Sequence, residues 1–176
     1  MAQHHVALVS VKVHSPQASS LMRQVFKESF KQDEVLQISS VYKVFEETAR
    51  PSHIHDLKTY ATTYGLCLVA KVSIIRGPQE LVDDLQGLQE AWTDPSTRRG
   101  VSLNLLVFED QVSMTPHLTL PHPELHLKAH LLIPSAEIWG QYQHPIIGQS
   151  LSELSQWWAN KTWGEFHAPG KSLLDF

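Results

Sequence analysis

Apolar side chains follow a strand-like pattern in four stretches of this chain. Residues 6–13 and 101–108 are rich in Val and Leu, residues 36–45 alternate apolar with polar positions, and residues 64–75 form a long β-rich run. Successive side chains of a strand point to opposite faces of a sheet, so alternation indicates a sheet with one buried face. We therefore predict four strands at these positions.

Two further stretches repeat apolar residues every three to five positions, as one face of a helix does. The first, residues 17–31, follows Ser15-Pro16, and the second, residues 79–92, follows Gly77-Pro78. Proline suits the first turn of a helix because its missing N–H has no partner there. The resulting order, β-α-β-β-α-β, predicts an α+β protein with the ferredoxin-like split βαβ fold, an antiparallel sheet with helices on one face.

The C-terminal third has a weaker pattern, which we interpret as a helical extension. One helix is expected from about residue 124 to 130 or beyond, limited by Pro134, and a second over residues 151–158. His126 and His130 would then share a helical face and could bind a transition metal, although no third ligand stands at a convincing spacing. The long connection over residues 46–62 carries no clear element, and such connections are often functional.

Composition and charge exclude several classes of protein. The 176 residues are 42% hydrophobic and 18% charged, as in a folded domain, so we expect one domain over residues 1–176. The formal net charge of -4 gives no overall basic field for binding nucleic acid. Residues 1–13 are typical of a strand rather than a signal peptide, and no stretch approaches the roughly 20 apolar residues of a membrane helix. A single Cys67, expected to be buried, fits a reducing compartment, so we expect a cytoplasmic protein without a membrane partner.

A specific motif occupies residues 118–134, which read LTLPHPELHLKAHLLIP. It is similar to the signature of the 6-hydroxymethyl-7,8-dihydropterin pyrophosphokinase (HPPK) family, a PHP motif followed by a basic residue and an apolar run that ends in proline. Residues 144–151, HPIIGQSL, resemble the HPxxGxxL stretch of that family, residues 39–42 resemble its SSxYxT, and residues 99–108 lie where it has RTLDLDxxxF. The resemblance covers roughly residues 5–156 and implies a ferredoxin-like core.

The resemblance also implies a reaction and shows a departure from it. The family transfers the terminal diphosphate of ATP to a reduced pterin in folate biosynthesis, with two magnesium ions on the phosphates. The two aspartates of its DxD motif correspond here to Ser102 and Asn104. Both face the same way on a strand, but neutral dipoles attract a hard divalent ion far less than carboxylates do. Glu109 and Asp110 do not replace them, because they stand roughly 16 to 20 Å further along the strand.

Other family positions supply candidate contacts for the nucleotide. Arg98, Arg99, His122 and Lys128 stand at or beside positions where the family uses cationic or hydrogen-bonding side chains on ATP, so we expect Arg99, His122 and Lys128 to converge on one cleft.

The positions that correspond to the pterin site are Tyr42, Cys67 and His130. The resemblance aligns Cys67 with an asparagine that reads the pterin edge, and His130 with an aromatic residue that stacks on the pterin. A site built to hydrogen-bond a heterocycle loses much of its discrimination when such partners are lost.

We therefore expect an HPPK-like pseudoenzyme that keeps a cleft for a nucleotide or a pterin-like small molecule, with ATP as a possible ligand and magnesium doubtful. One alternative is a divergent but active pyrophosphokinase in which Glu46, Glu47 or Asp56 supplies the metal charge. The other is a non-catalytic module that binds a protein partner, of which the sequence says nothing.

Overall fold

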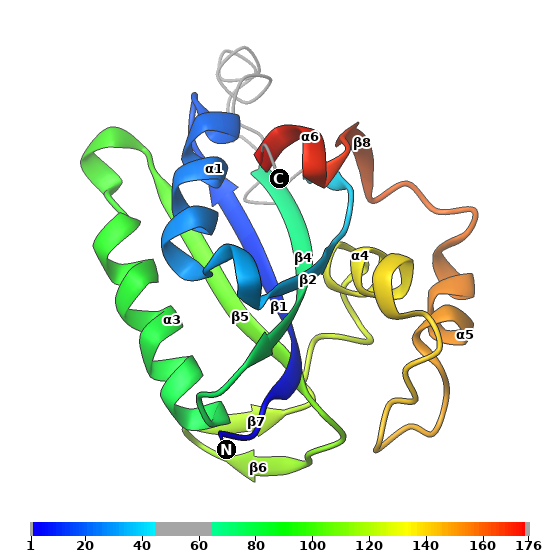
Figure 1. The fold of residues 1–176 in the computed structure, drawn as a ribbon. Coiled ribbons are helices and arrows are strands. Elements are labelled where there is room, and N and C mark those ends of the chain that lie inside the picture. The colour runs from blue at the N-terminus through cyan, green and yellow to red at the C-terminus, as the bar shows by residue number, and fades with distance from the viewer. Residues whose placement is uncertain (1, 45–64, 175–176) are drawn as a thin grey trace.

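The computed structural model describes residues 2–44 and 65–174, and Figure 1 shows their arrangement. The helices and strands are, in chain order, β1 (His5–His14), α1 (Ala18–Ser29), β2 (Val35–Ile38), β3 (Val41–Val44), β4 (Gly65–Ile74), α3 (Pro78–Trp92), β5 (Gly100–Phe108), β6 (Ser113–Thr115), β7 (Leu118–Leu120), α4 (Ala129–Trp139), α5 (Leu151–Ser155), β8 (Gly164–Ala168) and α6 (Gly170–Leu174).

One antiparallel sheet organises these elements. Its strand order is β5-β1-β4-β3-β8, and β2 also pairs with β4. This arrangement confirms the α+β class and the antiparallel sheet. The predicted second strand is divided into β2 and β3, because the chain kinks at Ser39 and Ser40. Ser39 turns its hydroxyl to the backbone there, where it donates to the Ser40 carbonyl at 2.8 Å and accepts the Val69 N–H at 2.9 Å.

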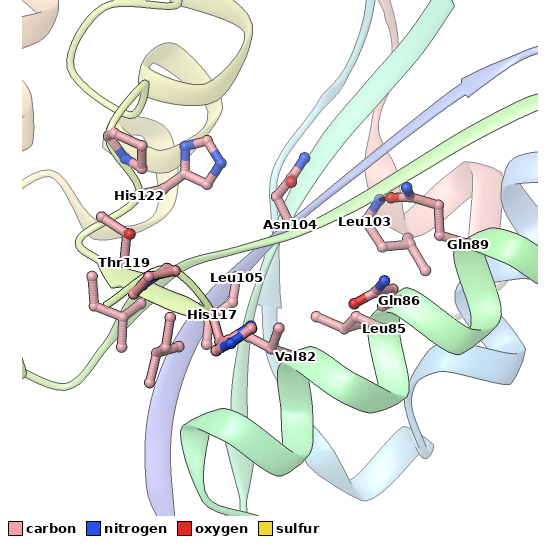
Figure 2. A pocket seen from close by; sticks show the side chains of 14 residues that line it. Val82, Leu85, Gln86, Gln89, Leu103, Asn104, Leu105, His117, Thr119 and His122 are labelled. Carbon is pink, nitrogen blue, oxygen red and sulfur yellow. Dashed lines mark hydrogen bonds between the residues drawn. The ribbon is translucent and has the colours of Figure 1, made fainter. Parts of the chain in front are cut away.

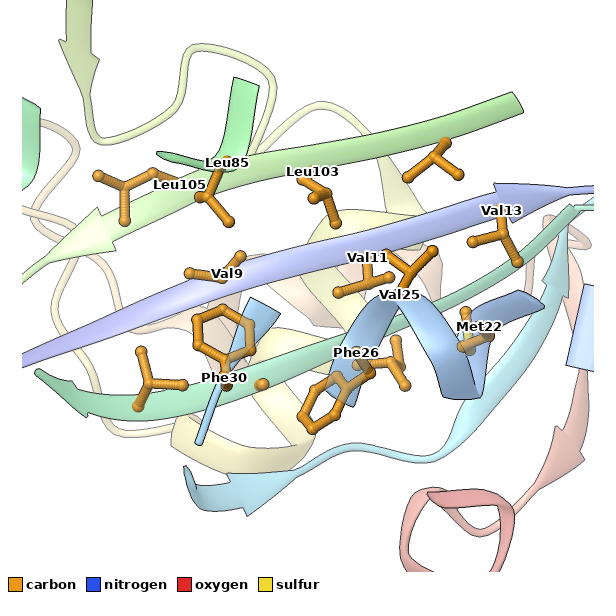
Figure 3. Close-up of a cluster of buried hydrophobic side chains, with 14 of the residues drawn as sticks. Val9, Val11, Val13, Met22, Val25, Phe26, Phe30, Leu85, Leu103 and Leu105 are labelled. Atoms are coloured by element: carbon orange, nitrogen blue, oxygen red, sulfur yellow. The ribbon is translucent and has the colours of Figure 1, made fainter. Parts of the chain in front are cut away.

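Helices α1 and α3 cover one face of the sheet, as predicted (Figure 1). The main core lies between them and the sheet, where Val9, Val11 and Val13 of β1 meet Phe26 of α1 (Figure 3). These four side chains are fully buried. The alternation along β1 therefore fixes which of its side chains remain for the opposite face.

The opposite face is partly covered by the C-terminal helices α4 and α5. A helical C-terminal extension was expected, but its place on this face was not. A second buried cluster joins Leu8 of β1 and Leu106 of β5 to Leu132 of α4 and Leu151 of α5. The expectation of helices on one face thus holds for α1 and α3 alone. The reason is that both faces of these strands carry apolar residues at this end of the sheet, so each face requires a cover.

Helix α4 differs from its predicted position. Residues 123–127 form turns, and the helix runs from Ala129 to Trp139 with Pro134 inside it. Pro134 has no N–H for the carbonyl four residues earlier. That carbonyl, on His130, lies 3.7 Å from the Cys67 Sγ, which donates to it instead. His126 therefore lies outside the helix, and its ring meets His144 at a centroid distance of 5.6 Å.

The C-terminal tail adds a strand that the sequence pattern did not indicate. Helix α5 ends at Ser155, one turn of 3₁₀ helix follows at Gln156–Trp158, and β8 then pairs with β3. Within the described residues, no helix combines the length and the apolar character that crossing a membrane requires.

Candidate functional site

A cleft of about 370 Å³ lies between α3, the edge strand β5 and the β6–β7 hairpin. Figure 2 shows Gln86 and Gln89 projecting from α3, with Asn104 and His122 on the other side of the opening. Because apolar residues recur with the helical period, the leucines of α3 point into the core and its glutamines lie at the margin of the cleft. The lining residues are Val82, Leu85, Gln86, Gln89, Leu103, Asn104, Leu105, Pro116, His117, Leu118, Thr119, Leu120, His122 and Pro123.

The lining of this cleft is neutral. Its 14 lining residues in the described part of the chain include no Lys, Arg, Asp or Glu, and their polar groups are amides, imidazoles and the hydroxyl of Thr119. The Gln89 Oε1 already accepts the Leu103 N–H at 3.0 Å. Leucine walls with a few amide and imidazole groups suit an uncharged, flat heterocycle that can form hydrogen bonds.

His122 is held as a neutral donor at the margin of the cleft. Its backbone N–H donates to the Leu106 carbonyl at 2.8 Å, and its Nδ1 accepts the Glu124 N–H at 3.2 Å. Burial lowers the pKa of His122, although the carboxylate of Glu124 opposes this effect. Because Nδ1 is an acceptor, the proton of the neutral ring resides on Nε2, which is then available to donate to a ligand.

A row of polar side chains crosses the sheet on the face opposite the main core. Ser102 of β5 pairs with Lys12 of β1, Lys12 also pairs with Cys67 of β4, and Cys67 pairs with Tyr42 of β3. Burial raises the pKa of the Cys67 thiol to about 12, and the charge of Lys12 opposes that rise. The predicted orientation of Ser102 holds, since its neighbours in β5 are buried on the other face.

A neighbouring pair continues this polar surface toward the cleft. Ser10 of β1 pairs with Asn104 of β5, and Asn104 also lines the cleft. The Ser10 Oγ is buried and forms no hydrogen bond within the described part of the chain. The cleft is thus adjacent to the polar face of the sheet, and Asn104 lies on that face and also lines the cleft.

These residues do not fit a magnesium ion. Magnesium is held through carboxylates and phosphates, whereas Ser102 and Asn104 offer a hydroxyl and an amide beside the ammonium group of Lys12. Across residues 2–44 and 65–174, no three His, Cys, Asp or Glu side chains gather as metal ligands. Glu109 lies past the far end of β5, where it contacts the His5 Nδ1 at 3.0 Å. The proposed substitutes Glu46, Glu47 and Asp56 lie outside the described residues.

The structure does not bring the predicted cationic residues together, so the expected convergence is wrong. Arg99 lines a separate hollow, and its Nε donates to the Trp92 carbonyl at 2.6 Å. Arg98 is exposed in the preceding turn, and Lys128 lines a third hollow with His130. The reason for the separation is geometric. Arg99 lies over the ring of Trp92 of α3 and lines its hollow together with residues of α1, whereas Lys128 is the N-cap of α4 on the opposite face.

The three predicted pterin positions are engaged within the protein. The Tyr42 hydroxyl donates to the Glu137 Oε2 at 2.7 Å, and its ring lies 5.1 Å from that of Trp163. Cys67 is buried, and His130 lines the same hollow as Trp163. Trp163 was not predicted from the sequence, because only the pairing of β8 with β3 brings it next to Tyr42.

Two further residues of the site were missed although the sequence carried signals for them. Gln86 occupies the polar side of a helix whose period had been recognised. Lys12 lies between two buried valines of a predicted strand, so the alternation already placed it on the opposite face.

Comparison with known proteins places this architecture among solved structures. The structure "HPPK-DHPS in complex with substrates" matches with a TM-score of 0.64 at 9% identity, over 88% of this chain and 43% of that one. Wild-type HPPK-DHPS of Plasmodium falciparum matches with a TM-score of 0.62 at 11% identity, over 89% of this chain and 45% of that one. These likenesses establish the fold, and this chain spans less than half of either structure.

Sequence comparison finds two curated relatives, both named 2-amino-4-hydroxy-6-hydroxymethyldihydropteridine pyrophosphokinase. The protein of Aquifex aeolicus is 26% identical over 138 residues, which are 74% of this chain and 79% of that protein. The protein of Synechocystis is 26% identical over 92 residues, which are 50% of this chain and 46% of that protein. No family model matches the chain.

Proposed function

We propose that this chain, a member of the hydroxymethyldihydropterin pyrophosphokinase family, binds a nucleotide in the cleft beside β5 and does not transfer its diphosphate. The single observation that carries this proposal is the replacement of both metal-binding carboxylates by Ser102 and Asn104 next to a cleft that is otherwise well formed.

The chemistry of the cleft supports the binding half of the proposal. A purine base offers ring nitrogens and an exocyclic group to hydrogen-bond partners, and the cleft presents amides at Gln86 and Asn104 and a neutral imidazole donor at His122. The buried side chains of Leu103 and Leu105 supply apolar contact for a flat ring. ATP, the nucleotide that the resemblance implies, is therefore the leading ligand.

The polar row supports the other half. Diphosphate transfer requires the charge that develops on the phosphates to be neutralised at the reacting centre, and in this family magnesium supplies that charge. Ser102 and Asn104 supply dipoles only, and Lys12 beside them repels a divalent cation. The nucleotide is thus expected to act as a bound ligand rather than as a substrate.

Titration calorimetry with adenosine and with ATP tests the binding half. Gln86→Trp places an indole in the cleft and should abolish the binding of both ligands. Gln79→Trp is the matched control, because Gln79 is also exposed on α3 and also bonds to an acidic residue four positions later, but does not line the cleft. If neither ligand binds the wild type, or if both variants bind equally well, the cleft is not a nucleotide site and the proposed function is wrong.

A further inference from the structure

Lys12 occupies a central position on the polar face of the sheet. It pairs with Ser102 on one side and with Cys67 on the other, and it lies between the buried residues Val11 and Val13. Because side chains alternate along a strand, Lys12, Ser102 and Asn104 all emerge on the face that the main core does not use. A cation therefore stands directly beside the two positions at which this family holds magnesium.

We propose that Lys12 binds the phosphate groups of the nucleotide directly, so that this chain takes the nucleotide without a divalent metal. This inference rests on the proposed function of the cleft and adds to it the way in which the anionic end of the ligand is held. Lys12 is a binding residue in this role, and no bond is made or broken.

The register gives a path from the cleft to Lys12. Asn104 lines the cleft, and Ser102 stands two residues earlier on the same face of β5. Directly paired side chains have Cβ atoms about 5 Å apart, and diagonal pairs such as Lys12 and Asn104 are about 7 to 8 Å apart. A nucleotide whose base lies in the cleft can thus extend its phosphates past the Asn104 amide to the Ser102 hydroxyl and the Lys12 ammonium group.

Charge explains why a metal is unnecessary and unfavourable there. An ammonium group forms charge-assisted hydrogen bonds with phosphate oxygens, which are stronger than those between neutral groups. The same ammonium repels Mg²⁺, and the metal-bound triphosphate carries less negative charge for Lys12 to attract. The charge of Lys12 opposes the rise in the pKa of the Cys67 thiol, which agrees with an ammonium group that lies close to Cys67 on the polar face of the sheet.

The test is calorimetric titration of ATP into wild type and variants, in EDTA and in magnesium. Lys12→Met should weaken ATP binding in EDTA about 10- to 100-fold, the usual effect of one charge-assisted hydrogen bond, and should leave adenosine binding unchanged. Lys12→Arg keeps the charge and should bind ATP within a few-fold of wild type. The control is Lys27→Met, an exposed lysine of α1 on the helix-covered side, which should bind as wild type does.

Wild-type protein gives a second readout that does not depend on the folding of any variant. Magnesium should weaken ATP binding to wild type or leave it unchanged, whereas in the triple variant Lys12→Met, Ser102→Asp, Asn104→Asp it should strengthen binding. The inference is overturned if Lys12→Met binds ATP like wild type, or if wild type requires magnesium. If adenosine does not bind but ATP still binds in a way that depends on Lys12, the base does not lie in the cleft and the proposed function is wrong. Lys12 then remains the phosphate contact.

Discussion

Replacing Ser39 by alanine should destabilise the protein far more than the loss of one hydroxyl suggests. Ser39 is fully buried at the kink between β2 and β3, and its Oγ accepts the Val69 N–H at 2.9 Å. Val69 is also fully buried, so water cannot readily take the place of the lost acceptor. An unsatisfied buried donor costs about 1 to 3 kcal/mol, and the lost bond to the Ser40 carbonyl adds about 1 kcal/mol.

The expected loss for Ser39→Ala is therefore about 2 to 4 kcal/mol in the free energy of unfolding. Urea denaturation measures it as a lower midpoint with an unchanged slope. Ser20→Ala is the control, because Ser20 is exposed on α1 and its replacement should change stability by less than about 0.5 kcal/mol. A loss below about 0.5 kcal/mol for Ser39→Ala would refute the view that this hydroxyl holds the kink.

Three further outcomes follow from the packing and from the shifted pKa values. Leu132→Ala, at a fully buried position that joins α4 to the sheet, should cost about 2 to 5 kcal/mol in urea denaturation, and a smaller loss would mean that α4 packs loosely. Burial raises the pKa of the Cys67 thiol to about 12, so the unfolded chain releases this proton first and stability should fall as pH rises above about 8.5. Cys67→Ala should flatten that fall between pH 8 and 11, and an unchanged slope would argue against the shift. Burial, and to a lesser extent the nearby His126, lowers the pKa of His144, so the folded protein keeps this ring neutral. The neutral ring contributes stability above pH 6.5, and this contribution is lost as pH falls below that value. His144→Asn should weaken the loss measured between pH 7 and 5, and the same loss in both proteins would exclude this histidine as its source.

The sequence predicted those parts of the fold that depend on local periodicity. The spacing of apolar residues in α1 and α3 required a helix with one buried face, and the alternation in β1 and β5 required a sheet. The break at Ser39 was not predictable, because the alternation of residues 36–45 continues through it and only the bonds to Val69 and Ser40 produce the kink. The strand β8 was missed because it exists only through its pairing with β3, which lies far away in the sequence.

The candidate site was predicted in part for the same reasons. Alternation placed Ser102 and Asn104 on one face of β5, and the structure agrees. The separation of Arg99 from Lys128 was not predictable, because Arg99 precedes β5 and its contact with Trp92 forms only in the folded chain. The cleft itself was not predictable either, because it needs α3, β5 and the β6–β7 hairpin to meet in space.

The measurement that most directly tests the proposed function is AMP release by the purified wild-type chain at saturating ATP, magnesium and 6-hydroxymethyl-7,8-dihydropterin. With Ser102 and Asn104 in place of the two carboxylates, we expect no AMP above the rate of a protein-free control. Turnover at about 1 to 100 per second, the range typical of kinases, would contradict the proposal and identify the chain as an active pyrophosphokinase.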